Sequence, residues 1–226
     1  NSIKEKSYWR NFYFLDKYFV SQVKNNRKKF LKIFRNNIFY NKESKLLDVG
    51  TTPSLDDHEN YLINKFPYKK NITCLSNFDC SILKKKFPQV ECVVGDGCGM
   101  AIENNFFEIV HSNATIEHVG SYKNQVNFIR ECVRVSKEYT FITTPNRFFP
   151  MDFHSKIPLI NLLTKNIFRK ILKLFGDNFF SKEENLNLLS KNEIKIMLSE
   201  LEIKNFKIIE NRFLGLVSNF LLVIKK

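Results

Sequence analysis

The chain has 226 residues, of which 43% are hydrophobic and 14% aromatic, and this length and composition predict one packed globular domain rather than two. The formal net charge of +13 would suit nucleic acid, an anionic membrane or an acidic substrate, but the basic residues are distributed, as a lysine-rich codon bias would also leave them. The five cysteines form no Cys-x-x-Cys zinc motif, no signal peptide opens the chain and no apolar run reaches about 18 residues, so we expect reduced thiols in a cytoplasmic protein without a transmembrane helix.

The first two thirds of the chain alternate between helical and strand patterns. Residues 4–40 are predicted to be helical, because apolar residues recur there at roughly helical spacing, interrupted by the basic stretch 24–29. Short apolar runs then predict strands, and the stretches between them predict helices. The expected strands are 45–49, 72–75, 90–94, 108–111 and 139–143, and the expected helices are about 55–66, 78–86 and 122–135. This alternation predicts a parallel sheet covered on both faces.

Residues 150–188 do not fit the alternation and are predicted to form a lid or another insertion. Within them, residues 165–175 carry apolar side chains on one helical face with lysine and arginine between them, and Gly176 is placed to end that helix. A basic helix of this kind can also lie on an anionic membrane, although packing against a core is the commoner use.

The C-terminal segment is predicted to complete the sheet. A helix is expected at 190–201, followed by strands at 206–210 and 219–224 that are joined by a turn around Gly215. The predicted fold class is therefore α/β and Rossmann-like. It has a seven-stranded, mostly parallel sheet with helices on both faces and an antiparallel last strand, in a single domain over residues 1–226. Residues 1–40 are an N-terminal helical extension to it.

The end of the first predicted strand suggests a ligand site. Leu46-Leu47-Asp48-Val49-Gly50 stops at a glycine, where backbone can approach a ligand without an intervening side chain. Ser54 and Asp57 resemble a capping box, so a helix N-terminus is expected there, beside the ligand crevice. An ordinary strand-to-helix turn would look the same.

Three later strands also end in small or polar residues. Val94-Gly95-Asp96-Gly97 places an acid where its carboxylate can accept a hydrogen bond from an adenine amino group. Ser112-Asn113-Ala114 and Thr143-Thr144-Pro145-Asn146 end the next two strands. In a parallel sheet these ends meet at one edge.

As a set, these motifs resemble the class I S-adenosylmethionine-dependent methyltransferases, in the broad small-molecule group that includes ubiquinone-biosynthesis-type enzymes. The resemblance runs from about Leu46 to Asn146 and rests on Leu-Asp-Val-Gly, Gly-Asp-Gly, Ile-Glu-His-Val, Arg-Glu-Cys-Val-Arg-Val and Thr-Thr-Pro-Asn. It implies that S-adenosylmethionine is the cofactor. The residues that it places around the methionine part, the ribose, the adenine and the sulfonium are Asp48, Gly50, Thr51, Ser76, Asn77, Asp96, Gly97, Asn113 and Ala114.

The chain departs from the family pattern at two positions. Gly50 is followed by Thr51-Thr52-Pro53, where the family continues Gly-x-Gly-x-Gly. Ser76 or Asn77, with Asp79 just beyond, stands in place of the acid that usually binds the ribose. A degenerate, non-catalytic binding module is therefore one alternative function.

Glu117, His118 and His154 are the predicted catalytic residues. A histidine near the substrate can act as a general base, and a second interpretation is that the two imidazoles and the carboxylate bind a divalent ion. Small-RNA 2′-O-methyltransferases look similar here, but Ala114 replaces one of their ligands, so we assign no metal. A third interpretation is structural, with His118 capping the next helix and His154 packing the lid.

The predicted function is methyl transfer to a small-molecule, glycan or lipid-linked acceptor. The alternative of an RNA 2′-O-methyltransferase is supported by the charge and the Glu-His pair. It is weakened because the chain has no Asn/Asp-Pro-Pro-Tyr/Phe motif and no appended RNA-binding module. Nucleic acid and peripheral membrane contacts are thus secondary partners, and the oligomeric state is left open.

Overall fold

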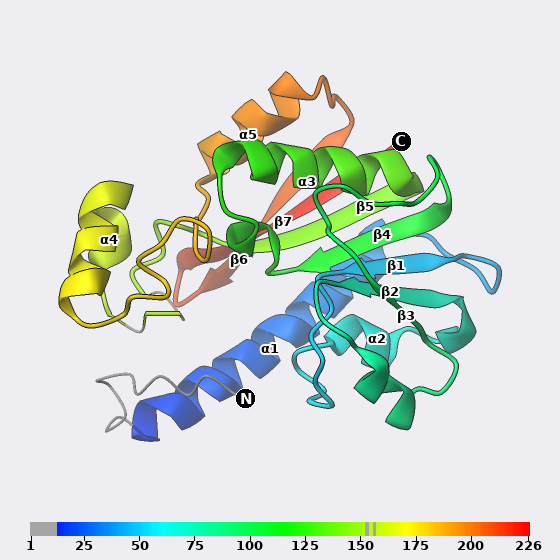
Figure 1. The fold of residues 1–226 in the computed structure, drawn as a ribbon, viewed down its shortest axis with the longest axis horizontal. Helices are drawn as coiled ribbons and strands as arrows, with labels where there is room; N and C mark the ends of the chain where they lie inside the picture. The colour runs from blue at the N-terminus through cyan, green and yellow to red at the C-terminus, as the bar shows by residue number, and fades with distance from the viewer. Residues whose placement is uncertain (1–12, 152–153, 156) are drawn as a thin grey trace.

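The computed structural model describes residues 13–151, 154–155 and 157–226, and its centre is a seven-stranded sheet with the order β3-β2-β1-β4-β5-β7-β6 (Figure 1). The first five strands are parallel, and β7 runs antiparallel to both of its neighbours. This confirms the predicted fold class. The strands are β1 (Leu46–Val49), β2 (Ile72–Ser76), β3 (Glu91–Val94), β4 (Phe107–Asn113), β5 (Ser136–Pro145), β6 (Phe206–Phe213) and β7 (Leu216–Lys225).

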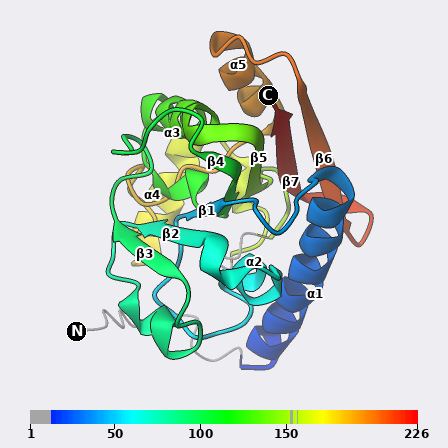
Figure 2. The ribbon, with the colours of Figure 1, turned by 90° about the vertical axis from the view of Figure 1, so that its right-hand side faces the viewer.

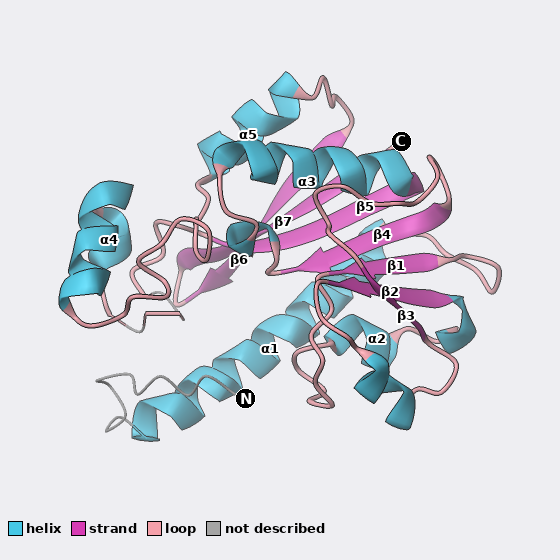
Figure 3. Cartoon of the chain, viewed as in Figure 1, coloured by secondary structure: helices cyan, strands magenta, loops and turns pink. Residues whose placement is uncertain are grey.

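Helices cover both faces of the sheet, because alternate residues of each central strand point to opposite sides. In β1, Leu46 packs in the cluster that contains α1 and α2, whereas Leu47 packs in the cluster that contains α3 and α5. Figure 3 shows the resulting layers. The helices are α1 (Tyr13–Asn37), α2 (Tyr61–Lys65), α3 (Tyr122–Val135), α4 (Lys165–Leu174) and α5 (Lys191–Glu200), with short 3₁₀ turns η1 (Lys69–Asn71), η2 (Ser81–Lys85), η3 (Ile116–His118) and η4 (Ile160–Leu162).

The helix predicted at 55–66 is wrong in its extent, and so is the capping box at Ser54 and Asp57. Only α2 forms, because the Asn60 side chain donates to the carbonyl oxygens of Thr52 (2.9 Å) and Ser54 (3.0 Å) and holds the preceding loop out of helical geometry. Asp57 pairs instead with Lys86. The helix predicted at 78–86 is likewise reduced to the 3₁₀ turn η2.

The N-terminal helix is present over the described part of the predicted segment, from Tyr13 onward, and residues 4–12 lie outside the described residues. Phe30 and Phe34 anchor it in the core. Its Asn26 accepts a hydrogen bond from Asn211 of β6 (3.1 Å), and Figure 2 shows α1 alongside the β6–β7 hairpin. The extension thus packs on the sheet.

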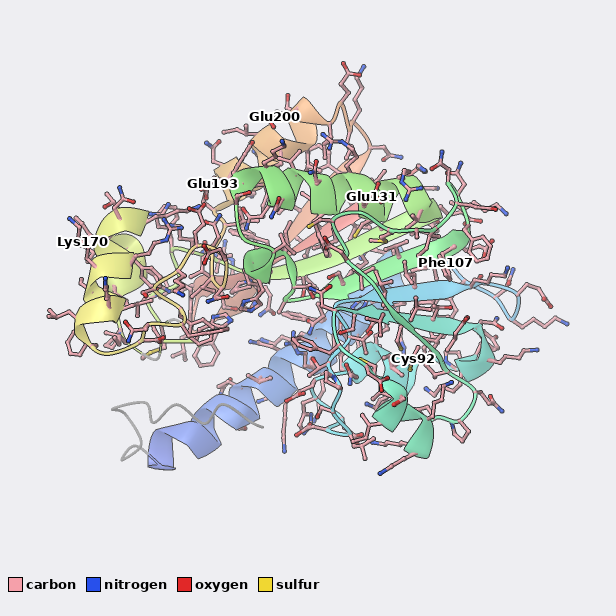
Figure 4. The ribbon with its side chains drawn as sticks, viewed as in Figure 1. Cys92, Phe107, Glu131, Lys170, Glu193 and Glu200 are labelled. Atoms are coloured by element: carbon pink, nitrogen blue, oxygen red, sulfur yellow. The ribbon has the colours of Figure 1, made fainter. Side chains whose placement is uncertain are left out.

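The segment 150–188 has a small apolar cluster of its own, which includes Phe168 and Leu172 of α4. It lies beyond the carboxyl ends of the parallel strands in Figure 1, and Gly176 ends α4 with φ of 81°, as predicted. An ion pair of 2.8 Å between Lys165 and Glu193 ties α4 to the start of α5. Figure 4 shows Lys170 on the side of α4 that faces away from the sheet. Among the described helices, none has the length and apolarity needed to cross a membrane.

Candidate functional site

A crevice of about 980 Å³ opens at the carboxyl ends of β1 to β4. The strand order reverses between β1 and β4, and ligands of open α/β sheets bind at such switch points. Its volume is at the upper end of the range of about 300–1,000 Å³ that is usual for ligand pockets. Every predicted cofactor-binding residue except Asp48 lines it, namely Gly50, Thr51, Ser76, Asn77, Asp96, Gly97, Asn113 and Ala114.

Asp48 lies beneath the crevice instead of on its wall. Its buried carboxylate accepts a hydrogen bond from Thr51 Oγ1 (2.7 Å) and pairs with the ring of His111. The other ring nitrogen of His111 shares a hydrogen bond of 3.0 Å with the Tyr61 hydroxyl, and burial raises the pKa of that phenol. Sequence reasoning missed His111, although a histidine within an apolar strand was a signal. The role that the geometry gives Asp48 is to hold the turn after β1.

Gly50 is required by the shape of the crevice wall. It has φ of 83°, in the left-handed region, and a Cβ at this position would lie 2.1 Å from Thr115 Oγ1. Gly97 is also closely packed, since a Cβ there would lie 2.8 Å from the ring of Phe128. Both glycines let backbone line the crevice.

Polar and aromatic groups stand at the end of the crevice formed by β2 and β3. Asp96 is exposed, and its Oδ1 accepts a hydrogen bond from the Cys98 backbone (2.8 Å). Ser76 Oγ accepts from the backbone of Phe78, whose ring is 68% exposed although it lines the crevice. Sequence reasoning missed Phe78. An exposed aromatic ring beside a carboxylate suits a flat, hydrogen-bonding ligand group.

Asn113 connects the floor of the crevice to α1. Its Oδ1 accepts hydrogen bonds from Thr143 Oγ1 (2.8 Å) and from the Arg27 guanidinium, which also lies over the rings of Phe30 and Tyr61. Burial lowers the pKa of Arg27, an effect that nearby negative charge opposes. Sequence reasoning also missed Arg27. The signal that could have identified it is the basic stretch 24–29, which interrupts the apolar pattern of the helix.

The three predicted catalytic residues come together at the rim. His118 lines the crevice, and its Nε2 lies 3.1 Å from His154 Nε2. Glu117 is completely buried, and its Oε2 accepts a hydrogen bond from Thr144 Oγ1 (3.0 Å). One potential ligand atom of each of the three residues lies within 4.8 Å of the others. Asp152, expected to orient His154, lies outside the described residues.

Comparisons with known proteins agree with this geometry. Residues 68–142 match the family model described as "Methyltransferase domain". An S-adenosylmethionine-dependent methyltransferase from Methanosarcina mazei is 14% identical with a TM-score of 0.54, and the match covers 86% of this chain and 96% of that one. One from Aquifex aeolicus is 15% identical with a TM-score of 0.56, and covers 91% and 97%.

A third similar structure is phosphoethanolamine N-methyltransferase 2 of Haemonchus contortus in complex with S-adenosyl-L-methionine. It is 14% identical with a TM-score of 0.55, and the match covers 81% of this chain but 38% of that one. A search of curated proteins finds no match. At these identities the solved structures establish the fold, which is that of the class I methyltransferases.

Proposed function

We propose that this chain, a methyltransferase of the class I fold, transfers the methyl group of S-adenosylmethionine to a small-molecule, glycan or lipid-linked acceptor. The observation that carries the proposal is the crevice at the switch point, whose wall is formed by the ends of β1, β2, β3 and β4. The methyltransferase-domain match covers three of these strands.

The crevice has groups that fit the cofactor. Bound S-adenosylmethionine supplies an electrophilic methyl group on a positively charged sulfur. The bare backbone at Gly50 leaves room for its methionine part, and Ser76 with Asn77 offers hydrogen-bonding groups for the ribose hydroxyls. Asp96 would accept a hydrogen bond from the adenine amino group, and Phe78 would stack on the adenine ring. The chain thus offers groups for the methionine part, the ribose and the adenine despite its shortened glycine loop.

His118, Glu117 and His154 activate the acceptor. His118 Nδ1 lies 2.7 Å from the Asn185 carbonyl oxygen, which can only accept, so Nδ1 carries a proton and the neutral ring leaves Nε2 with a free electron pair. That atom is suited to take a proton from an acceptor hydroxyl. His154, whose Nε2 lies 3.1 Å from His118 Nε2, would position the ring, and the carboxylate of Glu117 would balance the positive charge that the ring gains.

The insertion 150–188 would act as a lid over the acceptor. Glu184 and Asn185 already form part of the crevice wall. On α4, Ile167 is 46% exposed and Leu174 is 85% exposed, beside basic residues. Such a surface supports an acceptor with an apolar, lipid-linked part.

Calorimetric titration with S-adenosylmethionine and with its demethylated product tests the cofactor site. We expect the wild-type chain to bind both ligands, and Asp96→Ala to weaken binding by about 1–3 kcal/mol, the usual effect of losing a hydrogen bond to a charged group. Glu138→Ala is the matched control, because Glu138 is an exposed acid on β5 that does not line the crevice.

Two results would contradict the proposal. Absence of binding of either ligand to the wild-type chain would favour the degenerate module. Unchanged affinity in a folded Asp96→Ala variant would reject the adenine contact.

Fluorescence anisotropy with RNA oligonucleotides in a salt series tests the alternative of an RNA substrate. We expect weak binding that falls steeply with salt and does not distinguish sequences, because the charge of +13 comes from distributed basic residues. Tight binding of one sequence at physiological salt would instead support the RNA methyltransferase.

A further inference from the structure

The cluster of Glu117, His118 and His154 has the dimensions of a metal site. The two Nε2 atoms are 3.1 Å apart. One potential ligand atom from each of the three residues lies within 4.8 Å of the other two. Around a cation with Zn–N bonds of about 2.0–2.1 Å, neighbouring ligands at tetrahedral to octahedral angles are separated by about 2.8–3.4 Å. The imidazole pair already has this spacing, so little movement is needed to bind an ion.

The hydrogen bonds of His118 and Glu117 orient both side chains in the way that metal ligands require. His118 donates from Nδ1 to the Asn185 carbonyl, which directs the electron pair of Nε2 at the cluster. Metal-binding histidines commonly donate their second nitrogen to a backbone carbonyl in this manner. Thr144 likewise holds Oε2 of Glu117.

The other oxygen of Glu117 is a separate sign of a ligand. Glu117 is 0% exposed, yet its Oε1 has no hydrogen-bond partner among the described residues. Arg27 is near enough to interact electrostatically, but its guanidinium donates to Asn113 and not to Glu117. Because a buried carboxylate oxygen without a partner is costly, a cation bound at Oε1 would account for its presence.

From these observations we propose that Glu117, His118 and His154 bind a divalent transition-metal ion at the rim of the crevice. Two imidazole nitrogens and one carboxylate oxygen suit Zn²⁺, Fe²⁺, Co²⁺ or Mn²⁺. His154 comes from segment 150–188. The set has three protein ligands, because Ala114 stands where the small-RNA enzymes have a further glutamate, and for that reason sequence reasoning assigned no metal.

Three protein ligands leave coordination positions open to the acceptor. An ion there would bind and acidify a hydroxyl group, so it specifies an oxygen acceptor, and His118 would then be a ligand instead of the base. This last step rests on the proposed methyl transfer, whereas the cation site itself does not.

A hydrogen bond between the two histidines is the competing explanation. In that case His154 donates a hydrogen bond from its Nε2 to Nε2 of His118. The ring of Phe180 also packs against His154, with the ring centroids 5.3 Å apart. That arrangement explains the short contact between the rings, but it leaves Glu117 Oε1 without a partner.

Titration of the full chain with Co²⁺ or Mn²⁺, after chelation and without an affinity tag or methyl donor, tests the site. We expect one ion per chain, a Co²⁺ spectrum without thiolate bands and a higher melting temperature with metal. His118→Ala, His154→Ala and Glu117→Gln should each weaken binding about 100-fold or more, since losing even an outer-shell partner costs 10–100-fold. His58→Ala is the matched control, because His58 pairs with Asp56 outside the cluster.

No binding by the wild-type chain, or equal binding by a folded His154→Ala variant, would overturn the cation site in favour of the histidine hydrogen bond. His154 is half-buried, so its variant should remain folded even if Glu117→Gln does not. Asp96→Ala should bind Co²⁺ normally. In the wild-type chain, absence of cofactor binding together with intact Co²⁺ binding would refute the proposed function alone, and cofactor binding without Co²⁺ binding would refute the cation site alone.

Discussion

Replacing His118 by alanine is expected to lower the turnover of methyl transfer by about 10²–10⁴-fold, the usual contribution of a positioned acid–base group. The imidazole lines the crevice, and the hydrogen bond to the Asn185 carbonyl fixes a proton on Nδ1, so that Nε2 is the basic atom of the ring. The affinity for S-adenosylmethionine should stay nearly constant, because the proposed cofactor contacts lie at the ends of β1 to β4 and do not include His118. Transfer of a labelled methyl group and calorimetry measure the two quantities separately.

His118→Asn separates chemistry from structure. Its amide can still donate to the Asn185 carbonyl, but it has no imidazole nitrogen to act on the acceptor, so turnover should fall as far as in His118→Ala. Wild-type turnover in either the His118→Asn or the His118→Ala variant would show that the role of the ring is structural. If the cation is bound, chelation of the wild-type enzyme should also abolish transfer, and Co²⁺ or Mn²⁺ should restore it.

The second large effect is expected at Gly50. Gly50→Ala should reduce the free energy of unfolding by about 2–5 kcal/mol, because strain from a left-handed φ of 83° adds to the overlap of the new Cβ with Thr115. The crevice wall should shift as a result, and cofactor binding should be lost with it. Urea unfolding and calorimetry provide the two measurements.

Gly99→Ala is the matched control for Gly50→Ala, since a Cβ there would meet nothing within 4 Å and its φ is not in the left-handed region. Adding Thr115→Ala to Gly50→Ala should recover only part of the stability. The second substitution removes Oγ1 and Cγ2, which are 2.1 and 2.4 Å from the new Cβ. It leaves the Cβ of residue 115, at 2.8 Å, and the backbone strain. A Gly50→Ala variant as stable as the wild type would refute this account of the wall.

Secondary structure was predicted well where the interacting residues are close in the chain. The helix at 190–201 is an example. The structure shows that its start is stabilised by a reciprocal capping box between Ser190 and Glu193, which lie three residues apart. Ser54 and Asp57 have the same spacing, but the prediction there was wrong because Asn60 and Lys86 bind the groups that a helix start would need.

The roles of Asp48 and Arg27 depended on contacts between distant segments. Asp48 stands at the predicted strand end, but its carboxylate is used by His111, which is 63 positions away. Arg27 reaches Asn113 from α1 across 86 positions. Sequence periodicity reports which face of an element is apolar, and it carries no information about which distant polar group meets that face.

The sequence by itself determined the alternation of strands and helices, the antiparallel last strand and the edge at which the motifs meet. These features follow from side-chain periodicity and from the rule that parallel strands end on one side. Only the tertiary structure decided that Asp48 supports the turn, that α1 reaches the crevice floor, and that the insertion brings His154 to within 3.1 Å of His118. The physical reason is that a polar side chain is satisfied by whichever partner folding brings near it, and for these residues that partner is remote in the chain.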